Sequence, residues 1–300
     1  MRPAPVTGDD TTTGYYGNPV LKAPVWKPVI ALYFFTGGVA GASSTLGFAA
    51  LLTGNRRLAR SALVASVAAI AVSGPLLVVD LGRPARFLNM LRVAKPTSPM
   101  SVGSWILTAF APASMLAAAS AVTGRLPRTG RVAAGAAGVL GPAVATYTAV
   151  LVADTAIPAW HDAHRELPYL FAASVAASAA GTALAFTPVP DAGPARRLAV
   201  MGAALELVAF RAMETRLGEV AGPYKEGRAG SLARAAEACT AAGALLVVVA
   251  GRLRPAAVGA GALLCAGSLL TRHSVFRAGF ESAADPAATI GPQRRRRAAG

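Results

Sequence analysis

The sequence predicts an all-α, polytopic membrane protein with about eight transmembrane helices. Of the 300 residues, 54% are hydrophobic and only 14% are charged, whereas a soluble domain carries about 25% charged residues. Apolar runs of about 20 residues, the length needed to cross a bilayer, recur along the whole chain. No segment alternates apolar and polar residues in the way that a membrane-barrel strand does.

Eight apolar runs are predicted to span the membrane. In chain order they cover residues 28–52, 61–80, 104–123, 132–153, 167–187, 197–215, 232–251 and 255–274. Turns rich in Pro, Gly and Arg separate most of them, as expected where helices end outside lipid. The sixth run is the least apolar, because Glu206 and Arg211 interrupt it. In the first run, Gly37 and Gly41 predict a close contact between helices.

The segments outside the runs are a polar N-terminal stretch, residues 1–25, and a basic C-terminal tail, residues 287–300. No cleavable signal peptide is predicted ahead of the first run. The net charge of +15 does not indicate nucleic-acid binding, because no basic helix stripe with interleaved aromatic residues is present. Cys239 and Cys265 lie in apolar runs and are interpreted as small hydrophobic residues.

An even number of spans places both termini on one side. The loops on the opposite side are short and carry ten basic residues and one acid, Asp191. This positive charge in short loops predicts that the side opposite the termini is cytoplasmic and that the termini lie outside. The termini side holds the other nineteen basic residues, whose number alone favours the reverse orientation. Its longer loops of mixed charge predict a docking surface for a soluble partner.

Ionisable residues inside or at the ends of spans are expected to be functional. The candidates are Asp80, Asp154, Glu206, Arg211 and His273. Of these, Glu206, Asp154 and His273 are candidates for proton handling. Glu206 is the deepest, and Arg211, five residues further, points to another side of the helix. We therefore expect Glu206 either to bind a group on another helix as a structural carboxyl or to relay protons, whereas Arg211 pairs locally with Glu214.

Aromatic residues and one acid–base turn mark the termini-side ends of the spans. Asp80-Leu81-Gly82-Arg83-Pro84, followed by Arg86, is either a functional turn or a helix end with a local ion pair. Tyr147 is either an interface residue or a hydrogen-bond donor to a quinone carbonyl. The tryptophans at the span ends, which are interpreted as an interfacial belt, are Trp26, Trp105 and Trp160.

The chain has few histidine and cysteine residues that could bind a redox cofactor. Three histidines, of which only His273 lies in a span, cannot hold two b-type haems and make one improbable. Two cysteines cannot supply the four ligands of an iron–sulfur cluster. His161 and His164 beside acidic residues are the only conceivable metal pair, and a solvated loop is the preferred interpretation. We therefore predict no haem, no iron–sulfur cluster and no metal on this chain.

Several motifs in a fixed order carry a family resemblance. They are Tyr33-Phe-Phe-Thr-Gly-Gly-Val-Ala-Gly41, Asp80-Leu-Gly-Arg-Pro84 with Arg86-Phe87, Ser98-Pro-Met-Ser101 before Gly103-Ser-Trp105, Tyr147 with Ala156-Ile-Pro-Ala-Trp160, and Phe276 to Pro286. Together they resemble the NrfD-like family of polysulfide reductase membrane subunits, over residues 26–286.

The resemblance implies an eight-span membrane domain, residues 26–286, of two four-helix bundles, with residues 28–153 in the first and 154–274 in the second. It also implies a ferredoxin-like iron–sulfur subunit and a molybdopterin catalytic subunit as partners. Electrons would pass between the clusters and a quinone near the docking face. The chain would catalyse nothing on its own.

Site residues follow from the same resemblance. Tyr147 matches the family's quinone-contacting tyrosine, and Asp80, Arg83 and Trp26 are expected around the quinone. The residues expected on the partner-docking face are Arg86, Arg211 and Glu214. The family's polar asparagine in the first span falls at Ile30, so one hydrogen-bond donor is lost, and Trp26, Lys27 or Asn18 are the possible substitutes.

Two other functions remain open. The first is a purely structural membrane anchor without quinone binding, which Ile30 favours. The second is a transporter, against which stands the lack of an inverted repeat or of paired Gly/Pro-broken spans.

Overall fold

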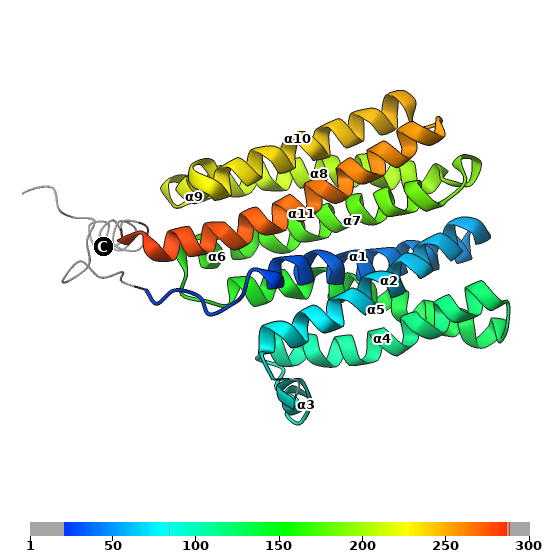
Figure 1. Cartoon of the computed structure of the whole chain (residues 1–300), viewed down its shortest axis with the longest axis horizontal. Coiled ribbons are helices and arrows are strands. Elements are labelled where there is room, and N and C mark those ends of the chain that lie inside the picture. Colours follow the sequence, from blue (N-terminus) through cyan, green and yellow to red (C-terminus); the bar gives the residue numbers. More distant parts are fainter. Residues whose placement is uncertain (1–20, 84, 287, 289–300) are drawn as a thin grey trace, which may run out of the picture.

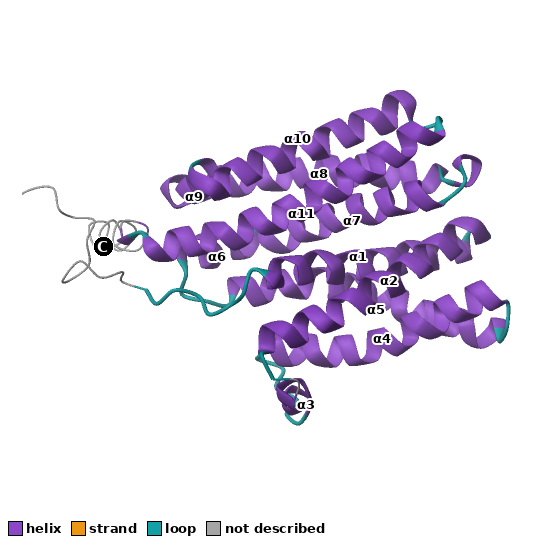
Figure 2. Cartoon of the chain, viewed as in Figure 1, coloured by secondary structure: helices purple, strands orange, loops and turns teal. Residues whose placement is uncertain are grey.

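The computed structural model describes residues 21–83, 85–286 and 288, and these form helices and turns without a strand (Figure 2). Their long helices follow the eight predicted spans one by one, which confirms the predicted all-α membrane fold. The long helices are α1 (Val29–Leu52), α2 (Arg56–Leu81), α4 (Pro99–Thr123), α5 (Pro127–Ala153), α7 (Leu167–Phe186), α8 (Gly193–Leu217), α10 (Gly227–Ala250) and α11 (Arg254–Ala284). Short helices in the connections are α3 (Ala85–Leu91), α6 (Pro158–His161), η2 (Asp162–Arg165), η3 (Val189–Asp191), η4 (Gly218–Ala221) and α9 (Gly222–Lys225).

The long helices form two bundles that lie side by side (Figure 1). Helices α1, α2, α4 and α5 make the first bundle, and α7, α8, α10 and α11 make the second. Helix α1 is the most buried of the first bundle and packs against both α7 and α11. The two bundles therefore share one continuous contact, centred on α1.

Within the described residues, seven helices are long and apolar enough to cross a membrane by length and composition. Helix α8, predicted to be the least apolar span, is not among them. It nevertheless has 25 residues and runs beside α7 and α10 (Figure 1). Its place in the bundle thus depends on how its charged residues are partnered.

Helix boundaries extend beyond the predicted spans. Helix α2 begins at Arg56 rather than 61, and α11 ends at Ala284 rather than 274. Hydropathy locates only the part of a helix that lies in lipid, whereas the hydrogen-bonded backbone continues into the interface, where charged side chains are solvated. Several arginines assigned to short loops therefore lie in the first turns of helices.

Glycine contacts hold each bundle tightly. A Cβ added to Gly41 of α1 would lie 2.4 Å from the carbonyl oxygen of Gly141 on α5, which confirms the predicted close contact at this position. In the second bundle, a Cβ on Gly261 of α11 would lie 2.3 Å from the carbonyl oxygen of Gly181 on α7. Small residues let backbones approach in lipid, where packing drives helix association.

The ends of the bundles differ. One end, here called the short-turn face, has the brief turns around Gly54, Gly124, residues 187–192 and Gly251. The other, the termini face, carries α3, α6, α9 and the points where the described chain begins and ends (Figure 1).

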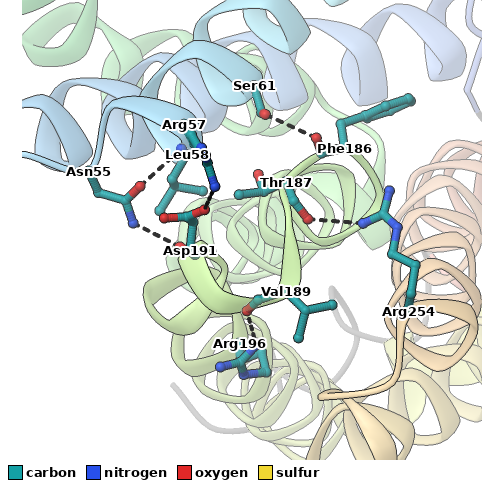
Figure 3. Close-up of polar contacts among 10 residues, drawn as sticks. All are labelled: Asn55, Arg57, Leu58, Ser61, Phe186, Thr187, Val189, Asp191, Arg196 and Arg254. Carbon is teal, nitrogen blue, oxygen red and sulfur yellow. Dashed lines mark hydrogen bonds and ion pairs between the residues drawn. The ribbon is translucent and has the colours of Figure 1, made fainter.

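At the short-turn face, the connection between α7 and α8 joins both bundles (Figure 3). Asn55 of the turn before α2 donates from Nδ2 to the carbonyl oxygen of Asp191 at 2.8 Å, and Arg57 pairs with the Asp191 carboxylate at 3.1 Å. From the second bundle, Arg254 donates to the carbonyl oxygen of Thr187 at 2.9 Å. These contacts fix the relative position of the bundles at this face.

Candidate functional site

A pocket lies at the termini-face end of the first bundle, among α1, α2, α3, α4 and α5. Its lining residues are Trp26, Ile30, Tyr33, Leu77, Asp80, Leu81, Met90, Met100, Ser104, Leu107, Tyr147 and Leu151. Three of the four residues predicted to surround a quinone, Trp26, Asp80 and Tyr147, meet here. The fourth, Arg83, is exposed in the turn after α2 and does not line the pocket.

The position of Tyr147 depends on a glycine of the neighbouring helix. A Cβ added to Gly103 of α4 would lie 2.3 Å from Cε2 of the Tyr147 ring, far inside van der Waals contact. Helix α4 begins just before this point, where Ser98 caps it and Pro99 occupies the first turn. The motif around Ser98 to Gly103 therefore makes the space that the phenol ring occupies.

Two phenols in the pocket have free hydroxyl groups. Tyr33 is only 2% exposed, and neither its hydroxyl nor that of Tyr147 bonds to any residue in the described part of the chain. The third hydroxyl, that of Ser104, donates to the carbonyl oxygen of Met100 at 2.8 Å. Because buried polar groups are normally hydrogen-bonded, the two phenols are suited to bind a ligand with oxygen acceptors.

Asp80 joins the start of α1 to the end of α2. Its Oδ1 accepts a hydrogen bond from the backbone N–H of Lys27 at 3.0 Å, and Lys27 Nζ donates to the carbonyl oxygen of Val79 at 2.8 Å. Arg86 instead donates to the carbonyl oxygen of Leu81 at 2.8 Å. Among the described residues Asp80 forms no ion pair with Arg83 or Arg86, so the predicted local ion pair in this turn is wrong.

An aromatic cluster connects the pocket to the second bundle. Trp26 stacks on Trp160 with ring centroids 5.4 Å apart. Trp160 is 1% exposed, donates from Nε1 to the carbonyl oxygen of Val275 at 2.6 Å, and packs directly against Gly279 of α11. The belt interpretation is therefore wrong for Trp160, a core residue, whereas Trp105 is 45% exposed. Sequence position near a span end did not distinguish the two.

Tyr224 of α9, at the termini face of the second bundle, contacts the segment that carries Trp160. Its hydroxyl donates to the carbonyl oxygen of Ala159 at 3.0 Å. Burial raises the pKa of Tyr224, so the phenol stays neutral and keeps its proton for this bond. The connection between α5 and α7 is thereby fixed beside Trp160.

The pocket is narrow. Its volume of about 40 Å³ holds little more than one water molecule, which takes about 30 Å³ in the liquid. Drug-sized ligands occupy pockets of about 300–1,000 Å³. Of its walls, Met90 on α3 and Met100 at the start of α4 are unbranched and flexible, so they are the side chains that can widen it.

A separate polar network crosses the second bundle. Glu206 of α8 is buried and accepts hydrogen bonds from Thr271 of α11 at 2.8 Å and from Thr240 of α10 at 3.4 Å. Ser174 of α7 bonds to Ser268 of α11 at 2.9 Å nearby. Of the alternatives that the sequence left open for Glu206, partners on other helices are the one seen here.

Arg272 completes this network and was missed in the sequence. It is 0% exposed, donates from Nη2 to the carbonyl oxygen of Phe171 at 2.8 Å, and lies over the Phe171 ring with 3.6 Å from Cζ to the centroid. It attracts Glu206 electrostatically without a direct ion pair. Its Nε and Nη1 have no hydrogen-bond partner among the described residues. An arginine within an apolar run was the signal that could have found it.

The remaining predicted residues lie elsewhere on the termini face. Asp154 is exposed at the end of α5. His273 forms a hydrogen bond between Nδ1 and the carbonyl oxygen of Leu269 on its own helix at 3.0 Å. Arg211 pairs with Glu214 at 3.1 Å, as predicted, and with Glu237 of α10 at 2.9 Å. None of these residues lines the pocket.

No metal site is found in the part of the chain that the structure describes, because no three His, Cys, Asp or Glu side chains are grouped there. His161 and His164 have ring centroids 5.9 Å apart, and His164 Nδ1 lies 2.9 Å from the carbonyl oxygen of His161. Asn18, considered as a substitute donor for the quinone, lies outside the described residues.

Comparison with known proteins identifies a family. A family model described as polysulphide reductase, NrfD, matches residues 17–213. This range contains every residue that lines the pocket and ends near the end of α8, so α10, α11 and the closing motif at Phe276 to Pro286 lie beyond it. No curated protein matches the chain.

Proposed function

We propose, from the premise that the chain belongs to the NrfD family of polysulphide reductase membrane proteins, that it binds a membrane quinone in the termini-face pocket and connects it to redox partners. Members of this family are membrane subunits of oxidoreductase complexes. The observation that carries the proposal is the pair of free phenol hydroxyls, Tyr33 and Tyr147, in a pocket that also contains the Asp80 carboxylate.

Tyr33 can replace the hydrogen-bond donor that is lost at Ile30. The side chain of Ile30 lines the pocket and offers no hydrogen bond. Tyr33 lies three residues further, on the same side of α1, and also lines the pocket. Its hydroxyl therefore supplies the donor that Ile30 lacks, which favours quinone binding over a purely structural anchor.

The residues that line the pocket have three different roles in the proposed quinone binding. The two phenols donate hydrogen bonds to carbonyl oxygens and so orient a ring between α1 and α5. Ile30, Leu77 and Leu107 provide apolar walls that exclude water and strengthen these bonds. Asp80, only partly buried at the termini face, is placed to exchange protons with solvent.

A quinone supplies the two-electron redox chemistry that the chain lacks. Its conversion to the quinol takes up two electrons and two protons, and the reverse reaction releases them. The electrons would be exchanged with a ferredoxin-like iron–sulfur subunit and, through it, with a molybdopterin catalytic subunit. Asp80 would pass the protons at the pocket mouth, while Met90 and Met100 move aside to admit the ring.

The termini face is the proposed docking surface for these partners. It lies next to the pocket and carries two exposed arginines, Arg83 just before α3 and Arg86 within it. Further along, Arg211 joins Glu214 and Glu237 in a charged group on the second bundle. We place this face on the outer, periplasmic side, because the short-turn face has the arginine-rich turns that favour the cytoplasm.

The test is quinone-linked turnover by the intact complex in native membranes. Tyr147→Phe and Tyr33→Phe each remove one hydrogen bond, worth about 1 kcal/mol. We expect each to raise the quinone concentration at half-maximal turnover roughly fivefold, and the double variant roughly 30-fold.

The matched control is Tyr169→Phe, because Tyr169 of α7 is exposed and lies outside the pocket. It should leave turnover unchanged. Partner subunits should co-purify in normal amounts with all these variants. If the double variant retains the wild-type dependence on quinone, the pocket is not the quinone site.

A further inference from the structure

A second and larger groove opens at the short-turn face of the second bundle. It lies between the start of α8 and the end of α10, continues along the turn to α11, and has a volume of about 710 Å³. It shares no lining residue with the termini-face pocket. The quinone proposal therefore gives it no role.

Some arginines of this face form hydrogen bonds or ion pairs within the described chain, and others do not. Arg57 pairs with Asp191 at 3.1 Å, and Arg196 and Arg254 donate to the carbonyl oxygens of Val189 at 3.0 Å and Thr187 at 2.9 Å (Figure 3). By contrast, Arg197 and Arg252 are exposed and bind no side chain or carbonyl in the described part of the chain. Both line the groove, together with Arg196.

The charge of the groove calls for an anion. Three arginines and no acid line it. Arg196 and Arg197 are the fourth and fifth residues of α8, near the end at which the helix dipole is positive and disfavours cations. A phosphate between Arg197 and Arg252 would neutralise both guanidinium groups and would also interact favourably with the helix N-terminus.

The rest of the groove is lined by apolar side chains. Val200, Met201 and Val248 line it. Met201 and Val248 are exposed, and the exposed row on α8 continues along the helix with Leu205 and Val208. Residues spaced in this way share one side of a helix. An occupant that matches both parts has an anionic head at the membrane surface and a long apolar body in the bilayer.

We propose that this groove binds an anionic phospholipid. Its phosphate lies between Arg197 and Arg252, and its acyl chains follow Met201, Leu205 and Val208 down α8. Among the long helices of the described chain, α8 is the one that is not apolar enough to cross a membrane by its composition. A lipid held along its outer side would cover it and fix it against α10.

The experiment uses the full chain purified in detergent, with bound lipid counted by native mass spectrometry. Phosphatidylglycerol and phosphatidylcholine are added in turn at equal concentrations. Each basic residue near a lipid surface contributes enough attraction for about a fivefold change in affinity. We expect the wild type to prefer phosphatidylglycerol and the Arg197→Gln/Arg252→Gln variant to lose roughly tenfold or more of this preference.

Two variants act as controls. Arg128→Gln/Arg131→Gln removes the same charge from exposed arginines of the same face, but on the first bundle, and should keep the preference. Arg197→Lys/Arg252→Lys keeps the charge and should retain most of it. The proposal is overturned if the double Gln variant keeps the preference, if phosphatidylcholine binds the wild type equally well, or if sodium phosphate at the same concentration displaces the lipid.

Discussion

The two bundles both bury polar side chains, but they partner them differently. In the first bundle, the hydroxyls of Tyr33 and Tyr147 line a pocket and bind nothing within the described chain. In the second, the Glu206 carboxylate accepts from Thr240 and Thr271. Free donors around a space are suited to a ligand, whereas donors and acceptors that bind one another hold helices together.

The partnered network also explains how a charged helix stays in the second bundle. Glu206 lies on α8 and its partners on α10 and α11, while Arg272 of α11 binds the backbone of α7 through Phe171. All four helices of the bundle thus contribute to one set of polar contacts. The first bundle has no comparable charged group in its interior among the described residues. Its buried polar contacts between helices include pairs of hydroxyl groups, as between Thr36 and Ser73 at 2.7 Å and between Ser66 and Ser114 at 2.8 Å.

The largest expected effect comes from breaking the charge balance of the second bundle. Glu206→Ala leaves the buried Arg272 without its electrostatic partner, which should lower the free energy of unfolding by about 3–5 kcal/mol. Arg272→Met should cost less, because a lone carboxyl can bind a proton. Thermal unfolding of the purified chain measures both.

A double variant that combines the same two changes, Glu206→Ala/Arg272→Met, sharpens this result. If the two residues interact, the double variant should be at least 1 kcal/mol more stable than the sum of the single losses predicts. Strictly additive losses would contradict the interaction. Quinone affinity in the first bundle, measured on the fraction that remains folded, should not change, and the role of Glu206 in proton handling stays a prediction until turnover is measured with it.

The helices of both bundles and part of the pocket could be predicted from the sequence, whereas contacts that depend on packing between helices could not. Long apolar runs give the eight helices directly, because lipid imposes one length and one composition on each span. Asp80, Tyr147 and Trp26 were correctly expected to lie near one another. Their convergence follows from alternate spans ending at the same face.

The residues that the sequence did not reveal are those whose role depends on packing across helices. Tyr33 lies in an apolar run, and only the approach of α4 and α5 makes it a pocket residue. Trp160 and Trp105 were both assigned to span ends, yet Trp160 contacts α11 and Trp105 is exposed. Arg272 was overlooked because leucines that precede it in the run, among them Leu264, Leu269 and Leu270, dominate the hydropathy of that run.

A smaller effect, confined to the first bundle, should follow from Gly103→Ala. The added methyl group would lie 2.3 Å from the Tyr147 ring, so the ring must move. We expect a loss of about 1–3 kcal/mol in stability and a fall in quinone-linked turnover of roughly tenfold or more, since a displacement of about 1 Å is costly at a reacting site.

Gly74→Ala is the matched control, because Gly74 lies in α2 of the same bundle and an added Cβ meets nothing within 4 Å. It should leave turnover unchanged and raise stability by up to about 1 kcal/mol, the difference in helix propensity. If Gly103→Ala proves as harmless as Gly74→Ala, the position of the Tyr147 ring does not matter for the function.

The smallest effects are expected at the two other proton-handling candidates, Asp154 and His273. Asp154 is exposed, and His273 bonds to its own helix through the carbonyl oxygen of Leu269; neither reaches the pocket or Glu206. Asp154→Asn and His273→Gln should therefore change quinone-linked turnover less than about twofold. Asp80→Asn in the same assay should lower turnover several-fold, because its carboxylate lines the pocket. A larger loss from Asp154→Asn than from Asp80→Asn would indicate that protons enter at the end of α5 and not at the pocket mouth. The free hydroxyl groups of the first bundle would then not mark the place where protons enter.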